Sequence, residues 1–437
     1  MRALGLLGVL TFSAACIEPL PPPPDAGEVP DAAVPLPEAT SNPSRGIDDT
    51  ALSFDLSART ATAVITFEPS PDAGATLEVG DLVIDAVTLN GVPLELARAD
   101  KTLTLGLPAS TDKLPVEIRY RWSHHEGFSG ASSGGYTLTW PYFCGNVFPC
   151  HATPNDGTTF SLALSGIPAG STAVFPARIA TEAPAYQLAW TIGEYTELPL
   201  GRTDAGTELV AWHLPGQAQQ MREGTAVLVP TFEWLEENLG PYRFGPRAGP
   251  VSANWGLVNG GMEHHPYWHL GGPALTNPDT HAHEAAHGWY GDAVRLACWE
   301  DFVLSEGTVT YLAARALEAV SSQRGADAWA ANTQALAGIN PMAPVWPSGC
   351  NSIDILAGLF SRAPYIRGAF FFRAVSLRIG APALDLALSA FYGAYAGKAA
   401  TMEQLLAVIH TVTGFDPHAC AEKWLRSTTI PAVGPCD

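Results

Sequence analysis

The segment HEAAHGWYGD, residues 283–292, decides how this chain folds and what it binds. His283 and His287 are four residues apart, and side chains at that spacing share one face of an α-helix, so both imidazoles can reach one metal ion. Glu284 lies beside them and is placed to act as a general base. A catalytic zinc ion takes three protein ligands and keeps one position open for water. The segment therefore predicts a helix that holds two of the three zinc ligands.

The third ligand is predicted to be Glu306. It lies in the segment Leu304-Ser305-Glu306-Gly307, with 18 residues between His287 and Glu306. A helix is predicted to begin there, and a helix returning past the first one can present its carboxylate to the same ion. One zinc ion bound by His283, His287 and Glu306 is thus the predicted cofactor.

Outward from this site, the chain divides into a strand-rich part and a helical part. Between about 50 and 200, alternating segments rich in β-branched and aromatic residues predict strands at 60–69, 77–89, 115–122, 158–167 and 186–195. After 205, helical periods predict helices at 225–242, 280–293, 306–320 and 402–414. Asn277 and Pro278 provide an N-cap and a first-turn proline for the second of these helices.

The N-terminus has the features of an export signal. Arg2 precedes an apolar stretch at 3–12, and small residues lead to Cys16, so we predict a signal peptide over 1–15. The cysteine position also resembles a bacterial lipobox, which implies a lipid on Cys16 and an outer-membrane or cell-surface location. A plain secretory signal cleaved nearby is the alternative. Residues 16–45 are rich in proline and predict an extended tether.

Composition limits the possible partners. The 437 residues are 47% hydrophobic, which favours a globular protein with two domains. The 43 acidic and 23 basic residues give a net charge of −20, which disfavours nucleic acid. Without Cys16 six cysteines remain, an even number that suggests disulfides in an oxidising compartment. Proximity favours Cys144–Cys150 and Cys420–Cys436 among the 15 possible pairings, which leaves Cys298–Cys350.

At this point the chain resembles the alanyl aminopeptidase family of zinc peptidases, gluzincins that include the leukotriene hydrolases. Its members follow HExxH with Trp, an aromatic residue and Gly-Asp, and then with Glu in a Leu-Asn-Glu-Gly context; residues 283–292 and 304–307 match this order. The resemblance implies an α+β multidomain fold. We expect an N-terminal β-rich domain of sandwich or saddle form at 46–204, and a mainly helical, thermolysin-like catalytic domain at 205–437.

The resemblance also assigns roles to residues outside the metal triad. Gly260-Gly261-Met262-Glu263-His264 matches a Gly-Ala-Met-Glu-Asn strand motif, which implies that Gly261, Met262 and Glu263 bind substrate. A carboxylate on an edge strand can pair with the free α-ammonium of a peptide. Tyr365, before Arg367-Gly368, matches a tyrosine that stabilises the oxyanion. Glu284 and Tyr365 are therefore the predicted catalytic residues.

Three departures from the family pattern limit the assignment. His264 replaces the usual Asn, Trp140 occupies the position nearest to a second amine anchor, and the chain ends where a large helical domain usually follows. We predict an aminopeptidase with a peptide substrate, and leave the oligomeric state open. An endopeptidase or a non-peptide hydrolase with the same zinc site is the alternative, and an inactive surface binding protein is a further one. For His264, His265, His269 and His281 we expect local hydrogen bonds and not a second metal, and for Asp292 and Asp301 structural roles.

Overall fold

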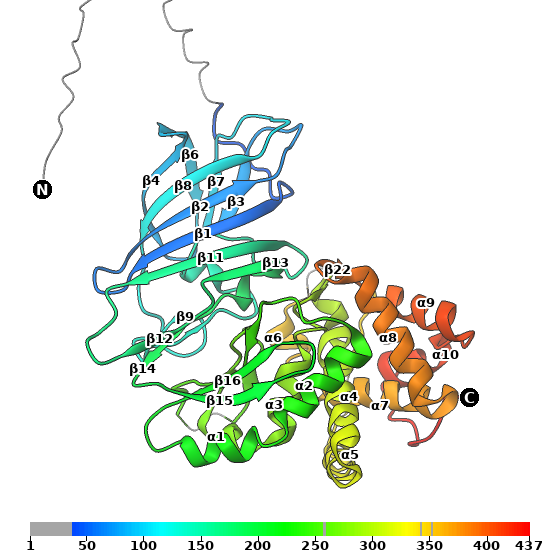
Figure 1. Ribbon diagram of the computed structural model, residues 1–437. Helices are drawn as coiled ribbons and strands as arrows, with labels where there is room; N and C mark the ends of the chain where they lie inside the picture. Colours follow the sequence, from blue (N-terminus) through cyan, green and yellow to red (C-terminus); the bar gives the residue numbers. More distant parts are fainter. Residues whose placement is uncertain (1–36, 257–258, 341–342, 351–352) are drawn as a thin grey trace, which may run out of the picture. The chain divides into compact units, whose positions relative to one another are not determined.

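The computed structural model describes residues 37–256, 259–340, 343–350 and 353–437 (Figure 1). These residues belong to one compact unit, Leu36–Asp437. The predicted signal peptide, Cys16 and residues 16–36 of the predicted tether lie outside the described residues. None of the helices in the described part combines the length and the apolar character that a membrane crossing requires.

The N-terminal region is built on a seven-stranded sheet with the order β13-β11-β1-β2-β8-β4-β5. Its strands are β1 (Ile47–Asp55), β2 (Thr60–Phe67), β4 (Val83–Leu89), β5 (Val92–Pro93), β8 (Leu114–Arg121), β11 (Gly157–Ser165) and β13 (Arg178–Pro184). Along β8 every second side chain is buried, with Val116, Ile118 and Tyr120 turned into the core. This alternation buries one face of the sheet, as the sequence predicted.

A second sheet of three strands adds to the same hydrophobic core. It has the order β3-β7-β6 and consists of β3 (Ala75–Glu78), β7 (Thr102–Leu105) and β6 (Leu96–Ala99). Two-stranded sheets pair β9 (Gly130–Ala131) with β10 (Thr137–Leu138), and β12 (Thr172–Val174) with β14 (Thr191–Gly193). The predicted strand at 186–195 is therefore only partly correct, because its first residues fold into a buried 3₁₀ turn, Ala185–Gln187.

The first described residues lie against this β region. Residues 37–45 close the predicted tether, yet Asn42 and Arg45 are buried. The guanidinium of Arg45 donates hydrogen bonds to the backbone carbonyls of Glu68, Gly74 and Pro108 at 3.3, 3.2 and 2.9 Å. The chain is therefore fixed to the fold just before β1 begins.

The C-terminal region combines a small sheet with many helices (Figure 1). The sheet has the order β15-β16-β18-β20-β19, with β17 beside β16. Its strands are β15 (Thr196–Arg202), β16 (Glu208–His213), β17 (Arg247–Ala248), β18 (Val251–Ser252), β19 (Gly261–Met262) and β20 (His269–Leu270). The domain boundary that we predict at 204/205 falls between β15 and β16, and it stays a prediction.

The same region contains the α-helices of the described chain. They are α1 (Ala218–Gly224), α2 (Leu228–Leu239), α3 (Pro278–Ala286), α4 (Phe302–Val320), α5 (Ser322–Ala337), α6 (Ile355–Gly358), α7 (Arg362–Ile379), α8 (Ala381–Tyr395), α9 (Met402–Thr413) and α10 (His418–Ala421). The helix predicted at 280–293 ends earlier, at Ala286, because the chain turns at Gly291 (φ 106°) and enters β21 (Val294–Leu296). β21 pairs with β22 (Lys398–Ala400).

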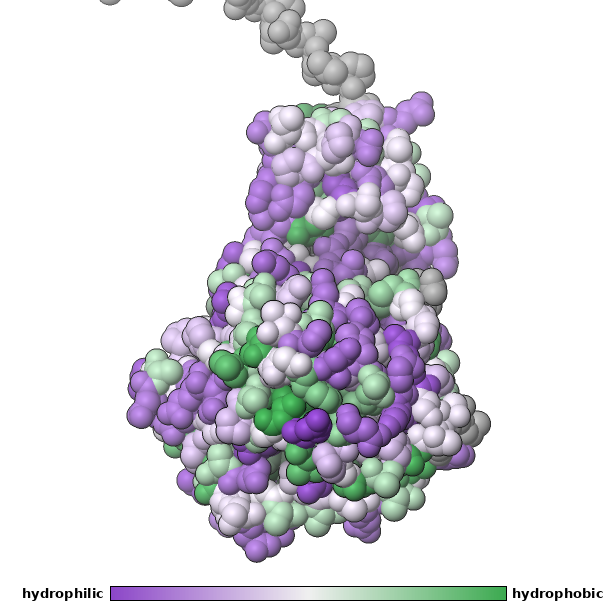
Figure 2. All heavy atoms as spheres, turned by 90° about the vertical axis from the view of Figure 1, so that its right-hand side faces the viewer, coloured by the Kyte–Doolittle hydropathy of each residue, from purple (hydrophilic) through white to green (hydrophobic). Residues whose placement is uncertain are grey.

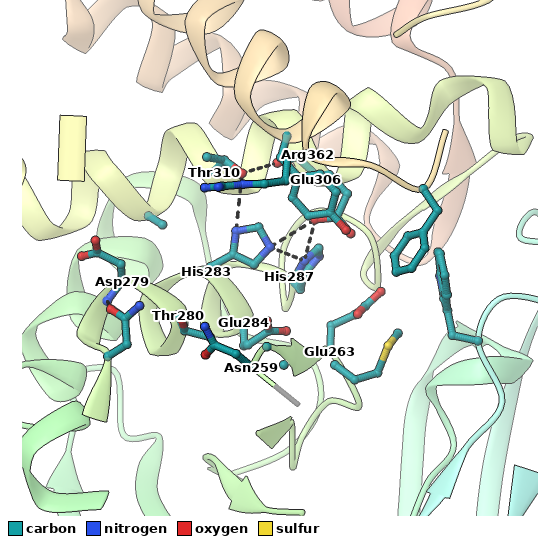
Figure 3. A pocket seen from close by; sticks show the side chains of 18 of the residues that line it. Asn259, Glu263, Asp279, Thr280, His283, Glu284, His287, Glu306, Thr310 and Arg362 are labelled. Atoms are coloured by element: carbon teal, nitrogen blue, oxygen red, sulfur yellow. Dashed lines mark hydrogen bonds and ion pairs between the residues drawn. The ribbon is translucent and has the colours of Figure 1, made fainter. Parts of the chain in front are cut away.

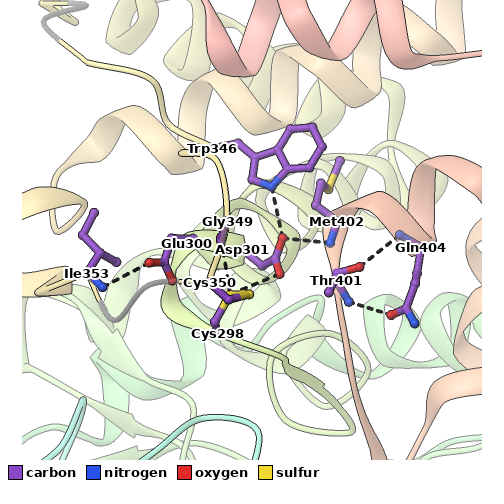
Figure 4. The surroundings of a disulfide bond; sticks show 10 residues. All are labelled: Cys298, Glu300, Asp301, Trp346, Gly349, Cys350, Ile353, Thr401, Met402 and Gln404. Carbon is purple, nitrogen blue, oxygen red and sulfur yellow. Dashed lines mark hydrogen bonds between the residues drawn. A yellow bond between two sulfur atoms is a disulfide. The ribbon is translucent and has the colours of Figure 1, made fainter.

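The three predicted disulfides are all formed: Cys144–Cys150, Cys298–Cys350 and Cys420–Cys436. Figure 4 shows the surroundings of the second one. Asp301 lies beside it and accepts hydrogen bonds from the indole N–H of Trp346 (3.1 Å) and the backbone N–H of Met402 (3.0 Å). This carboxylate joins three segments of the helical region, which is a structural role.

Polar contacts join the β region to the helical region. Arg295 on β21 donates to the backbone carbonyl and to the carboxylate of Glu182, each at 2.9 Å. Gln187 donates to the carbonyl of His265 at 3.0 Å. Figure 2 shows the face on the right of Figure 1, where hydrophobic residues are interrupted by hydrophilic ones and the β region is mostly hydrophilic. On that face, the described residues form no broad apolar surface.

Candidate metal centre and active site

Helix α3 presents the two candidate histidine ligands. Asn277 caps its N-terminus, since the Asn277 side chain accepts a hydrogen bond from the backbone N–H of Asp279 at 3.0 Å, and Pro278 occupies the first turn. His287 follows the last helical residue and keeps helical dihedral angles (φ −60°, ψ −23°). His283 and His287 therefore project from one face of the helix, as Figure 3 shows.

Two crossing helices bring Glu306 and Tyr365 to the same place. Glu306 lies on α4 and Tyr365 on α7. The helices touch at Gly307 and Gly368, where an added Cβ on Gly307 would lie 2.7 Å from the Cα of Gly368. Because both residues at this crossing are glycines, the two backbones can approach closely. The Tyr365 hydroxyl forms a hydrogen bond with the Glu306 carboxylate.

The three candidate ligand atoms form a small triangle. Nε2 of His283 lies 3.1 Å from Oε2 of Glu306, Nε2 of His287 lies 3.4 Å from the same oxygen, and the two nitrogens are 3.2 Å apart. In a tetrahedral zinc site with bonds of about 2.1 Å, ligand atoms are separated by roughly 3.3 Å. The spacing of the three atoms thus fits one zinc ion.

The tautomers of both histidines also fit a cation. Nδ1 of His287 lies 3.0 Å from the carbonyl oxygen of Tyr290, which only accepts, so Nδ1 carries the hydrogen. The Thr310 hydroxyl donates to the carbonyl of Glu306 at 2.7 Å, which leaves its oxygen to accept from Nδ1 of His283 at 3.5 Å. With both Nδ1 atoms protonated, the two Nε2 lone pairs face each other and a carboxylate, an arrangement suited to binding a cation between them.

The buried charges of the site also favour a bound cation. Burial opposes the charged forms of His287 and Glu306, but the attraction between the two side chains outweighs it. The pKa of His287 is therefore raised, and the pKa of Glu306 is lowered. Glu263, Glu284 and Glu306 are all buried. Within the described residues, no Lys or Arg forms an ion pair with any of the three. A divalent cation would offset this buried negative charge.

Glu284 lines the same cavity as the metal ligands, close to His287, where it can act as a general base. Its carboxylate packs against Gly261 so closely that an added Cβ there would lie 2.3 Å from Oε1 of Glu284. Gly261, which we predicted to bind substrate, thus also gives the Glu284 carboxylate its space. Burial raises the pKa of Glu284 well above its ordinary value, and Glu263 and Glu306 add to the shift.

The sequence predicted Glu263 on an edge strand, and in the structure it directly follows the edge strand β19. Burial raises the pKa of its carboxyl to about 7, and a hydrogen bond from the Tyr186 hydroxyl partly opposes that shift. Met262 and Glu263 both line the cavity that contains the metal ligands. A buried carboxylate without a cationic partner is suited to bind an incoming ammonium group.

Tyr186 is a site residue that the sequence analysis missed. We expect Tyr186→Phe to raise the KM for substrates with a free N-terminus by about tenfold, with a smaller change in kcat, because a hydrogen bond to a charged carboxylate is lost. Tyr195→Phe is the matched control, since Tyr195 donates to the carbonyl of Ser252 at 2.7 Å, away from the cavity. Steady-state kinetics on both variants check the prediction, and an unchanged KM would contradict it.

The neighbouring histidines have local partners. His265 bridges the Tyr242 hydroxyl and the carbonyl of Glu284, each at 2.8 Å, and His281 contacts the carbonyl of Leu275 at 3.0 Å. His264 and His269 lie 3.0 Å apart through their Nδ1 atoms. In the described ranges none of the four joins a cluster suited to a metal. Asp292 is fully buried near His287, and burial raises its pKa.

All predicted site residues meet at one cavity of about 1060 Å³. Its lining includes the three candidate ligands, Glu284, Tyr365, and the segment 261–263. In Figure 3, Glu263 lies on one side of the two metal-binding histidines, and Asp279 and Thr280 lie on the other. An extended ligand with one end at Glu263 can therefore pass the metal position and continue toward Asp279 and Thr280.

Comparison with known proteins agrees with this arrangement. Residues 274–424 match the model of the Peptidase family M1 domain. A leucine aminopeptidase 2 from Phaeosphaeria nodorum is 30% identical over 208 residues, which cover 39% of this chain and 31% of that protein. The chain spans 31 and 45% of the length of two such curated relatives. The matched segment lies in the helical part of the chain, where the sequence analysis predicted the zinc peptidase domain.

Solved structures show the same fold over nearly the whole chain. A two-domain M1 zinc metallopeptidase, solved as a mutant bound to L-tryptophan, is 18% identical, with a TM-score of 0.77 over 90% of this chain and 96% of that one. A mutant enzyme from Deinococcus radiodurans with a Tyr-Ser-Ala substrate is 19% identical, with a TM-score of 0.77 over 89 and 96%. The predicted fold class, a β-rich region followed by a helical catalytic region, is confirmed.

Proposed function

We propose, from the Peptidase family M1 domain at 274–424, that this protein is a zinc-dependent aminopeptidase that removes N-terminal residues from peptides. The observation that carries the proposal is the order of groups along the cavity: a buried carboxylate at Glu263 and then the triangle of His283, His287 and Glu306. When the α-ammonium of a peptide pairs with Glu263, the first peptide bond of that peptide lies at the triangle of metal ligands.

Each residue has a role in this scheme. Zinc on the three ligands would lower the pKa of a water molecule and polarise the peptide carbonyl. Glu284 accepts the proton of the attacking water and passes it to the leaving amine. Tyr365 donates a hydrogen bond to the oxygen that gains negative charge. Glu263, held by Tyr186, binds the α-ammonium and excludes peptides that lack one.

The test compares free and blocked N-termini. We expect acetylation of a peptide's N-terminus to lower kcat/KM at least about 100-fold, because it leaves the Glu263 carboxylate buried and unpaired. Mass spectrometry of the products measures this. Rapid internal cleavage of acetylated peptides would instead favour an endopeptidase, and the Glu263→Gln variant should narrow the difference between the two substrates.

Export of the protein is part of the proposal. Three disulfides within the described residues are supporting observations, since disulfides persist in oxidising compartments. We propose that residues 1–15 direct export and that Cys16 carries a lipid, which holds the enzyme at a membrane surface through residues 16–36. The mass of the mature N-terminal peptide would distinguish a lipidated from a plain cleaved N-terminus.

A further inference from the structure

The cavity that contains the metal ligands has a cationic side chain in its wall. Arg362 is the only Lys or Arg among the described residues that line the cavity. It is exposed to solvent, and within the described part of the chain no Asp or Glu forms an ion pair with it. The same lining contains the carboxylates of Glu263, Asp279, Glu284 and Glu306. The guanidinium of Arg362 is therefore available to an anionic group of a ligand.

Arg362 lies beyond the metal position as seen from the amine anchor. Ligand atoms of Glu263 and His287 lie within 4.8 Å of each other, so the anchor is on the His287 side of the metal site. The ring of His283, the other histidine, stacks on that of Tyr365 at 5.9 Å. Arg362 precedes Tyr365 by three residues on α7, so both side chains project from one face of the helix. In Figure 3, Arg362 lies on the far side of His283 from Glu263.

The start of α7 favours an anion at the same place. Arg362 is the first residue of this helix, and Ser361, the N-cap, also lines the cavity. The Ser361 side chain accepts a hydrogen bond from the backbone N–H of Ala363 at 3.3 Å, which stabilises the helix end. The positive end of the helix dipole adds to the charge of the guanidinium. A planar guanidinium can bind both oxygens of a carboxylate, so a carboxylate is the anion that this position fits.

The C-terminal carboxylate of a short peptide would reach this position. With the α-ammonium at Glu263 and the first peptide bond at the metal ligands, the carboxylate of a di- or tripeptide lies roughly 3.5 to 7 Å beyond that bond, since an extended chain advances about 3.5 Å per residue. A longer peptide has an uncharged peptide bond at the same distance. Its carboxylate would lie nearer to Asp279, which is further from Glu263 in Figure 3 and repels a second negative charge.

We propose that Arg362 binds the C-terminal carboxylate of short peptides and makes the enzyme prefer di- and tripeptides to longer chains. This inference rests on the proposed aminopeptidase function, because the α-ammonium at Glu263 sets the position of the substrate. Two opposite charges, on Glu263 and Arg362, then select the length of a peptide that lies across the metal position.

The test compares peptides with their C-terminal amides. We expect kcat/KM for Leu-Gly-Gly to exceed that for Leu-Gly-Gly amide by about tenfold, because the amide cannot form the charge-assisted hydrogen bonds to Arg362. A hexapeptide that begins with Leu-Gly-Gly and its amide should differ little. Mass spectrometry of the released leucine measures all four rates. Calorimetry on the zinc-loaded Glu284→Gln protein should show the same preference in Kd, in the absence of turnover.

Variants of Arg362 separate carboxylate binding from folding defects. Arg362→Ala should lower the acid-to-amide ratio of the tripeptide to about one, and Arg362→Lys should keep part of it. Arg362→Glu should reverse the preference, which loss of folded protein cannot do. Arg378→Ala is the matched control and should keep the wild-type ratio, because Arg378 is exposed on the same helix and absent from the cavity lining.

The possible outcomes distinguish this inference from the proposed function. Equal rates on the tripeptide and its amide, or a ratio that Arg362→Glu leaves unchanged, would overturn the role of Arg362. An equally large ratio for the hexapeptide pair would overturn the preference for short chains. A leucyl arylamide tests the aminopeptidase function separately, since it has no C-terminal carboxylate. No cleavage of the arylamide or of any peptide by the zinc-loaded protein would overturn the proposed function, and with it this inference.

Discussion

Glu284→Gln is expected to lower kcat by about a thousandfold or more while one zinc ion per chain remains bound. Gln has the shape of Glu, so it fits the space beside Gly261 that the Glu284 carboxylate occupies. Its amide cannot accept the proton of the attacking water. Rates on an aminoacyl arylamide, together with zinc analysis of the same preparation, measure both parts of the prediction.

A Glu→Gln exchange elsewhere provides the control for this variant. Glu237 lies exposed on α2, outside the cavity lining, so Glu237→Gln should retain the wild-type rate. A Glu284→Gln enzyme with at least a tenth of wild-type kcat would show that another group accepts the proton.

Glu306→Ala is expected to lower zinc affinity at least about 100-fold and to reduce activity to background. The variant leaves two histidines and removes the carboxylate that lies 3.1 and 3.4 Å from their Nε2 atoms. Because zinc binds the folded chain, chelation should lower the Tm of the wild type. The Tm of Glu306→Ala, measured by calorimetry, should no longer respond to the chelator.

Glu318→Ala controls for changes in the same helix. Glu318 is exposed near the C-terminal end of α4, where it pairs with Arg315. This variant should keep both its zinc and its response to the chelator. Full zinc occupancy in Glu306→Ala would mean that the third ligand is a different residue.

Local chemistry explains which site features the sequence could predict. His283, Glu284 and His287 lie within about one turn of a helix, so their spacing alone predicts that they share one face. Glu306 could be added because it lies in the segment Leu304–Gly307 at the start of the next predicted helix. The Cys298–Cys350 pair was predictable only because proximity had already paired the other four cysteines. The β region was predictable because its strands are long enough to alternate, as β8 shows.

The missed features depend on contacts between distant segments. Strands β17 to β20 have two residues each, too short for any period, so a sheet in the helical region was not predicted. Tyr186 is 77 residues away from Glu263 in sequence, and its neighbours suggested only a strand. Trp140 was recognised as unusual, but its place beside Phe360 required the fold.

The burial of Arg45 has a mechanical consequence. If the N-terminus is held at a surface, a pull on the chain reaches Ser41 and Asn42, which bond to Thr76, and then Arg45, whose guanidinium donates to three carbonyls. Beyond it, the force enters β1, which lies inside the sheet between β11 and β2. For a force along β1, its ladder hydrogen bonds lie across the force and are loaded together in shear, not opened one at a time. The load is thus borne by the β sheet, and the metal site is spared.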